Sequence, residues 1–139
     1  MTSQHLLNPH TALPGYCAVV LFILLCTSHA LARDSAKVQY INASGKNVVF
    51  TVTVTAPAPG SLIIQHSHDP ANKLINATPQ ARQIDNSSGT AKWLIPNVRP
   101  GRYTFSLTFA GAVRTQNMHA ALRYRTPGSG AFREHTARP

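Results

Sequence analysis

Acidic residues are scarce in this chain. Its 139 residues include four Asp and Glu against 13 Lys and Arg, which gives a formal net charge of +9 at pH 7. The acidic residues are Asp34, Asp69, Asp85 and Glu134. Glycoside hydrolysis needs two carboxyl groups placed across a cleft, so this chain is poorly equipped for such acid–base chemistry. The excess of positive charge instead predicts attraction to anionic partners such as lipid headgroups or acidic polysaccharide.

Cysteine is almost absent as well. The chain has two, Cys17 and Cys26, and both lie in its first 32 residues. From residue 33 onward the sequence therefore offers no disulfide, no thiol nucleophile and no thiolate metal ligand. Stability there must come from a packed core, and the length of this part suits a single domain of ordinary size.

The chain has one long hydrophobic run, the eleven residues from Tyr16 to Cys26. The run is too short to span a hydrocarbon core of ~30 Å comfortably. It is followed by Ala30-Leu31-Ala32, the small-x-small pattern that signal peptidase accepts, and then by a charged pair. We predict that residues 1–32 are a cleavable signal peptide with the cut after Ala32, and that the protein is secreted or periplasmic. Because no Lys or Arg precedes the run, an uncleaved signal anchor is the alternative.

Alternation of apolar and polar residues dominates the rest of the chain. Residues 47–55 alternate in β-branched residues, and residues 102–109 place aromatic and Leu side chains on one face and Arg, Thr and Ser on the other. This pattern is typical of an antiparallel sheet with one face in water. Weaker strands are predicted at 37–41, 61–66, 91–95 and 116–125, with a loop and a short edge strand within 69–82. Residues 116–125 could instead form a short helix, because Met, Ala, Leu and Arg favour helices.

Turn residues separate these strands at short intervals. Six or seven short strands with such spacing predict an all-β fold, a small antiparallel immunoglobulin-like sandwich at residues 33–125. Tyr103 follows the Pro100-Gly101 corner, where a tyrosine of such sandwiches hydrogen-bonds back to the preceding backbone; alternatively it is simply the first core residue of its strand. Residues 126–139 are Pro/Gly-rich, basic and without pattern, so we predict a disordered tail.

Residues 59–109 resemble bacterial immunoglobulin-like surface repeats. The resemblance rests on the small-residue turn Ala77-Thr78-Pro79, on Gly89 with Trp93, and on Pro100-Gly101 followed by Tyr103 to Phe105. It implies a β-sandwich that serves as a spacer or adhesive domain of exported proteins. It brings no catalytic residues with it.

His66 and His68 are the first candidate site. On a strand they point to the same side, roughly 7 Å apart, so two imidazoles could share one metal. Asp69, or the distant Met118 and His119, could complete the site; a set of histidine and methionine ligands suits copper, and zinc is the other metal considered. The competing interpretation is that these histidines are half-exposed polar residues where a strand leaves the core.

A row of basic side chains is the second candidate site. His119, Arg123 and Arg125 alternate to one side of the last predicted strand, and Arg102 and Arg114 are expected nearby. Such a row could bind phosphate or acidic sugar. The competing interpretation is edge protection, in which charges on an outer strand block aggregation between sheets.

Two functional hypotheses follow. The first is an exported, non-catalytic β-sandwich module with structural or interaction roles at the cell envelope, whose partner is a protein or an anionic envelope component. It needs no cofactor, no specific nucleic acid and no transmembrane segment after cleavage. The second is a small periplasmic copper- or zinc-binding protein. We predict no enzymatic activity, because neighbours such as Ser67, His68 and Asp69 face opposite ways on a strand and cannot form a catalytic triad.

Overall fold

The computed structural model describes residues 34–139. The predicted signal peptide, residues 1–32, and its cleavage site lie outside the described residues. Residues 34–139 form one compact unit. Within this part of the chain no helix is long and apolar enough to cross a membrane.

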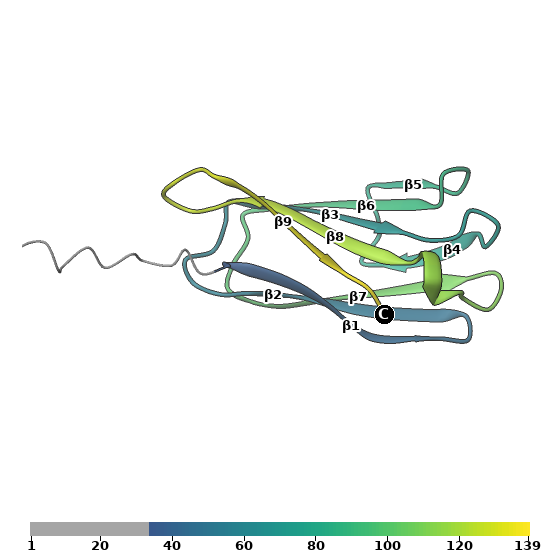
Figure 1. Cartoon of the computed structure of the whole chain (residues 1–139). Coiled ribbons are helices and arrows are strands. Elements are labelled where there is room, and N and C mark those ends of the chain that lie inside the picture. Colours follow the sequence, from purple (N-terminus) through teal and green to yellow (C-terminus); the bar gives the residue numbers. More distant parts are fainter. Residues whose placement is uncertain (1–33) are drawn as a thin grey trace, which may run out of the picture. The chain divides into compact units, whose positions relative to one another are not determined.

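The described residues form nine β-strands and one 3₁₀ turn. These are β1 (Ala36–Ser44), β2 (Asn47–Val54), β3 (Ser61–Ser67), β4 (Leu74–Thr78), β5 (Gln83–Asp85), β6 (Thr90–Pro96), β7 (Gly101–Phe109), η1 (Thr115–Asn117), β8 (His119–Arg125) and β9 (Phe132–Ala137). A four-stranded sheet has the order β1-β2-β7-β4, and a five-stranded sheet has the order β5-β6-β3-β8-β9 (Figure 1). All pairings are antiparallel, so the predicted all-β antiparallel sandwich is confirmed.

The core lies between the two sheets and uses the faces that the alternation predicts. From β2 and β7 the side chains of Phe50 and Phe105 are fully buried, and these two residues are partners in the sheet register. Their rings stack with centroids 4.9 Å apart. Trp93 of β6 packs edge-on against Phe105 at 5.3 Å, and its indole N–H donates to the carbonyl of Pro79 at 2.8 Å. Burial of each such side chain contributes about 1.5–3 kcal/mol, which lets the sandwich form without a disulfide.

The predicted tyrosine corner is confirmed. The hydroxyl of Tyr103 donates to the carbonyl of Arg99 at 2.9 Å and accepts from the amide of the same residue at 3.0 Å. These two bonds close the turn immediately before β7. The turn therefore holds the chain where it crosses from the five-stranded sheet to the four-stranded one.

The predicted disordered tail at residues 126–139 is wrong. β9 pairs with β8 along its whole length, and the turn between them is closed by a hydrogen bond from the Thr126 amide to the Ala131 carbonyl at 2.7 Å. Arg123 forms an ion pair with Glu134 of this strand at 2.9 Å, and Nε2 of His135 lies 2.9 Å from the carboxylate of Asp34. β9 lies at the edge of the sheet and is held by backbone pairing and side-chain contacts, and none of its side chains is buried. Its sequence therefore needs no alternation of apolar and polar residues. The sandwich thus extends well beyond residue 125.

Other differences are smaller. Within residues 116–125 the predicted strand is β8, which begins only at His119, because Gln116 and Asn117 belong to the 3₁₀ turn η1. The short edge strand expected within 69–82 is β4. β5 was not predicted, because its three residues directly precede a turn. The total is nine strands in the described residues rather than six or seven.

The tyrosine corner gives a test of the fold. Replacing Tyr103 with Phe removes both hydrogen bonds and is expected to lower the free energy of unfolding by about 1 kcal/mol. The matched control is Tyr124→Phe, because the buried Tyr124 hydroxyl has no hydrogen-bond partner among the described residues. That control should not lower stability. Urea denaturation of both variants measures the difference, and equal destabilisation would contradict a structural role of the corner.

Candidate functional site

His66 and His68 lie in the core, and the interpretation of them as half-exposed strand ends is wrong. His66 is fully buried and His68 is 5 % exposed. β3 turns every second side chain inward, so the two histidines continue the face that buries Leu62 and Ile64. The register partners of His66 on the neighbouring strands are the small residues Ala91 and Ala120, which leave room for the imidazole.

Aromatic rings surround the two imidazoles. The ring of His66 stacks on Phe50, with centroids 5.7 Å apart and an angle of 11° between the planes. The ring of His68 meets Phe109 edge-on at 4.9 Å, and Tyr40 lies edge-on to His66 at 6.0 Å. The two imidazoles are 5.8 Å apart between centroids. They therefore form an adjacent pair enclosed by apolar rings.

None of the four imidazole nitrogens of this pair has a hydrogen-bond partner among the described residues. Burial, with smaller effects of His68 and His119, lowers the pKa of His66 to about 3. Burial also lowers the pKa of His68, and the nearby Asp69 partly opposes this effect. Both rings are therefore neutral at pH 7 and carry free lone pairs.

The four predicted metal ligands do not converge as one set. Met118 is 2 % exposed, on the inner side of the strand, whereas His119 is half-buried on the outer side. The ladder between β3 and β8 ends at the pair Ser67 and His119, and His68 and Met118 are the next residues beyond it on the two strands. Among residues 34–139 no group of three or more His, Cys, Asp and Glu side chains could hold a metal ion. The inner set is thus two histidines and one methionine, without His119.

The five predicted basic residues do not share one face. Arg123, Arg125 and His119 lie on the outer side of the five-stranded sheet. Arg102 lies on the outer side of the four-stranded sheet, where it pairs with Thr53, and Arg114 lies in the loop before η1. The prediction that these residues lie near one another is therefore wrong for Arg102, and for Arg114 it stays a prediction. The prediction failed for Arg102 because alternation along a strand is visible in the local sequence, whereas the sheet to which each strand belongs is not.

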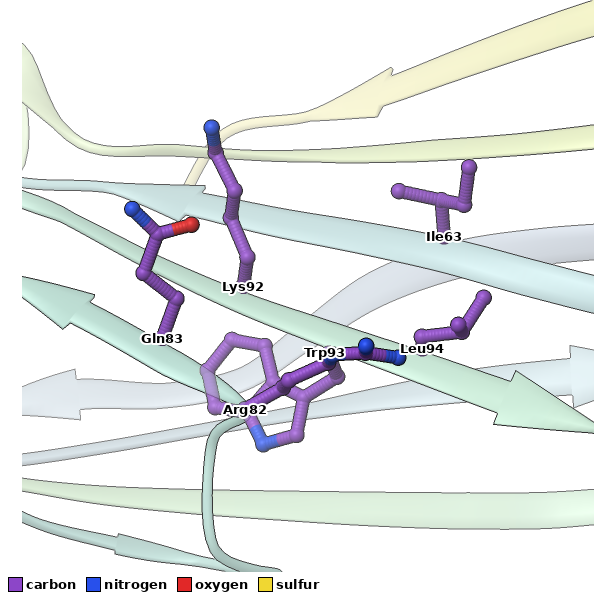
Figure 2. Close-up of a pocket in the computed structure, with 6 residues that line it drawn as sticks. All are labelled: Ile63, Arg82, Gln83, Lys92, Trp93 and Leu94. Carbon is purple, nitrogen blue, oxygen red and sulfur yellow. The ribbon is translucent and has the colours of Figure 1, made fainter.

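A cavity that the sequence reasoning missed lies on the outer face of the five-stranded sheet. Its volume is about 540 Å³ and it is lined by Ile63, Arg82, Gln83, Lys92, Trp93 and Leu94 (Figure 2). Ile63 and Leu94 are cross-strand partners, each 43 % exposed. The sequence contains a pattern that could have predicted this surface. β3 and β6 carry apolar residues on both of their faces, although one apolar face would suffice for the core.

The outer face of the other sheet has a different chemistry. Its side chains from β2 and β7 are largely hydroxyl-bearing, and Lys37 and Arg102 supply its positive charge at one end. The hydroxyl-bearing residues are Thr51, Thr53, Thr104, Ser106 and Thr108. The four-stranded sheet also exposes Ile41 of β1 and Ile75 of β4, whereas Ile63 and Leu94 of the five-stranded sheet are cross-strand partners that line the cavity together with Arg82 and Lys92.

The buried His66 predicts acid sensitivity of the metal-free protein. Because its pKa is about 3 in the folded state and near 6.5 otherwise, the unfolded state takes up the proton first. The contribution of neutral His66 is complete above pH 6.5 and is lost as the pH falls, by about 1.4 kcal/mol per pH unit. Denaturation curves in the presence of EDTA between pH 7 and about pH 4 measure this slope.

The variant His66→Phe should reduce that slope by about the contribution of one histidine. A smaller slope remains from His68. The matched control His119→Gln changes a histidine on the outer side of the neighbouring strand and should keep nearly the whole slope. Identical slopes for His66→Phe and the unaltered protein would contradict the assignment.

Comparison of the chain with protein-family models, curated proteins and solved structures gives no match. The resemblance of residues 59–109 to immunoglobulin-like surface repeats remains a prediction from the sequence. Function is therefore inferred from the residues and their arrangement in the sandwich.

Proposed function

We propose that this chain is an exported, non-catalytic β-sandwich module that binds an anionic component of the cell envelope. The binding surface is the outer face of the five-stranded sheet. The observation that carries the proposal is the cavity in which Arg82 and Lys92 stand beside the exposed Ile63 and Leu94. Export is supported by the apolar run at residues 16–26 and the Ala30-Leu31-Ala32 pattern that follows it.

Two cations of this face are free of acidic partners. In the described residues the salt bridges are Arg123–Glu134 and His135–Asp34, and neither Arg82 nor Lys92 takes part in them. Residues 1–33 contain no Asp or Glu that could pair with either cation. The charge of Arg82 and Lys92 is therefore available to a ligand, whereas that of Arg123 is already compensated.

The apolar part of the face narrows the class of ligand. Ile63 and Leu94 stand side by side, and Phe132, 59 % exposed, pairs with Arg125 on the outer side of the same sheet. Exposed apolar side chains flanked by cations suit a ligand that joins an anionic group to a hydrocarbon part. Acidic phospholipids have this composition, and acidic polysaccharide lacks the hydrocarbon part. An acidic lipid surface is thus the component that fits best.

The proposal is tested by co-sedimentation of the purified protein with lipid vesicles. We expect binding to vesicles that contain phosphatidylglycerol, much weaker binding to neutral phosphatidylcholine vesicles, and a decrease at high salt. Free glycerol phosphate and an acidic polysaccharide serve as competitors. Competition by either at concentrations matched in charge to the lipid would show that the anionic group alone is recognised.

Charge variants locate the binding face. Arg82→Gln/Lys92→Gln should weaken vesicle binding about 30-fold, because each basic residue near an anionic surface contributes about 1 kcal/mol. The matched control, Lys37→Gln/Arg102→Gln, removes the same charge from the outer face of the other sheet and should weaken binding far less. Equal loss in both variants would mean that net charge alone drives binding, and would overturn this site.

A further inference from the structure

We propose that His66, His68 and Met118 bind one copper(I) ion inside the sandwich. This site is separate from the outer face of the five-stranded sheet and goes beyond the proposed binding of an anionic envelope component. The ligands come from β3, from the residue that follows it, and from the residue that precedes β8. All three are buried, with exposed fractions of 0 %, 5 % and 2 %.

The spacing of the two imidazoles fits a shared ion. Metal–nitrogen bonds to histidine are about 2.0–2.1 Å long, so two rings bonded to the same ion have their centres about 6 Å apart when the bonds open widely around it. The centroids of His66 and His68 are 5.8 Å apart. Rotation of the rings about their side-chain bonds can then direct one nitrogen of each toward the point between them.

The imidazole nitrogens lack any other partner. All four are buried without a hydrogen bond among the described residues, and leaving buried polar groups unpaired destabilises the fold. Buried polar atoms left unpaired in this way require an explanation, and a bound ion is one. Burial also keeps both rings neutral, which is the protonation state that a metal ligand needs.

Copper(I) suits the chemistry of these residues better than zinc. The thioether of Met118 is a soft ligand, and soft ligands select copper(I). Structural zinc sites take four ligands, and in residues 34–139 no cluster of three or more His, Cys, Asp and Glu side chains is present. A single positive charge also costs less than a double one among Phe50, Phe109 and Tyr40.

The test uses the full chain with Cys17→Ser/Cys26→Ser, because those thiols would themselves bind copper(I). The metal-free protein competes anaerobically with a colorimetric copper(I) chelator, and a parallel thermal melt is recorded with and without copper(I). We expect one ion per chain and a rise of the melting temperature. Zn²⁺ is examined in the same melt and should raise the melting temperature less.

Single variants connect the binding to the three residues. His66→Phe and His68→Phe should weaken copper(I) binding by about 100-fold or more, and Met118→Leu by about 10-fold. Because the Phe variants remove unpaired buried nitrogens, their metal-free melting temperatures should not fall, so a loss of binding is not a loss of folding. His119→Gln, on the outer side next to Met118, should bind as the parent does.

Three outcomes would overturn the site. They are the absence of bound copper(I), unchanged binding in His66→Phe, and an equal loss in His119→Gln. A larger stabilisation by Zn²⁺ than by copper(I) would overturn the choice of metal. Vesicle binding involves none of these residues, so each proposal can fail without the other.

Discussion

The packing of Phe50 links the two sheets, and the rest of the sandwich depends on it. Within its own sheet it stacks on Phe105 at 4.9 Å. Across the core it meets His66 at 5.7 Å and Trp93 at 6.0 Å, both of the five-stranded sheet. The chain has no cysteine after residue 26, so aromatic contacts of this kind, and not a disulfide within the sandwich, join the two sheets.

The side chains between the sheets complete the core, and the two outer faces of the sandwich differ in their chemistry. The four-stranded sheet carries hydroxyl-bearing side chains on the outer side of β2 and β7 and exposes Ile41 and Ile75 on its edge strands β1 and β4. The five-stranded sheet keeps Ile63 and Leu94 exposed, although Leu62, Ile64 and Trp93 already complete its inner side. Apolar residues that the fold does not need cost solubility, and a binding role for that face accounts for them.

The strands and the buried faces were predictable wherever one side of a strand meets the core. The alternation in residues 47–55 and 102–109 and the Tyr103 corner predicted the inner surfaces of β2 and β7, because burial there is a local property of the pattern. β9 was not predictable in this way. Its residues (FREHTA) are held at a sheet edge by backbone pairing, by Arg123 of the neighbouring strand β8 and by Asp34, which is about a hundred residues away in the sequence.

The same contrast explains how far the candidate sites could be predicted. The spacing of His66 and His68 correctly placed both on one side of β3, but their burial depends on packing against Phe50 and Phe109, from the other sheet. The separation of Arg102 from Arg123 depends on which sheet each strand joins. The alternation of apolar and polar residues predicts on which side of a strand a side chain lies. The residues that pack against that side chain depend on the order of the strands in the two sheets.

The buried histidines bear on both the stability of the fold and the proposed metal site. Two neutral imidazoles without hydrogen bonds weaken the core, and apolar residues of similar size would fill the same space without that cost. An ion that binds only the folded state adds its free energy of binding to the free energy of unfolding. With such an ion the two histidines would stabilise the fold instead of weakening it. The polar pair would then make the stability of this disulfide-free sandwich depend on metal, which a core of Phe and Leu alone could not do.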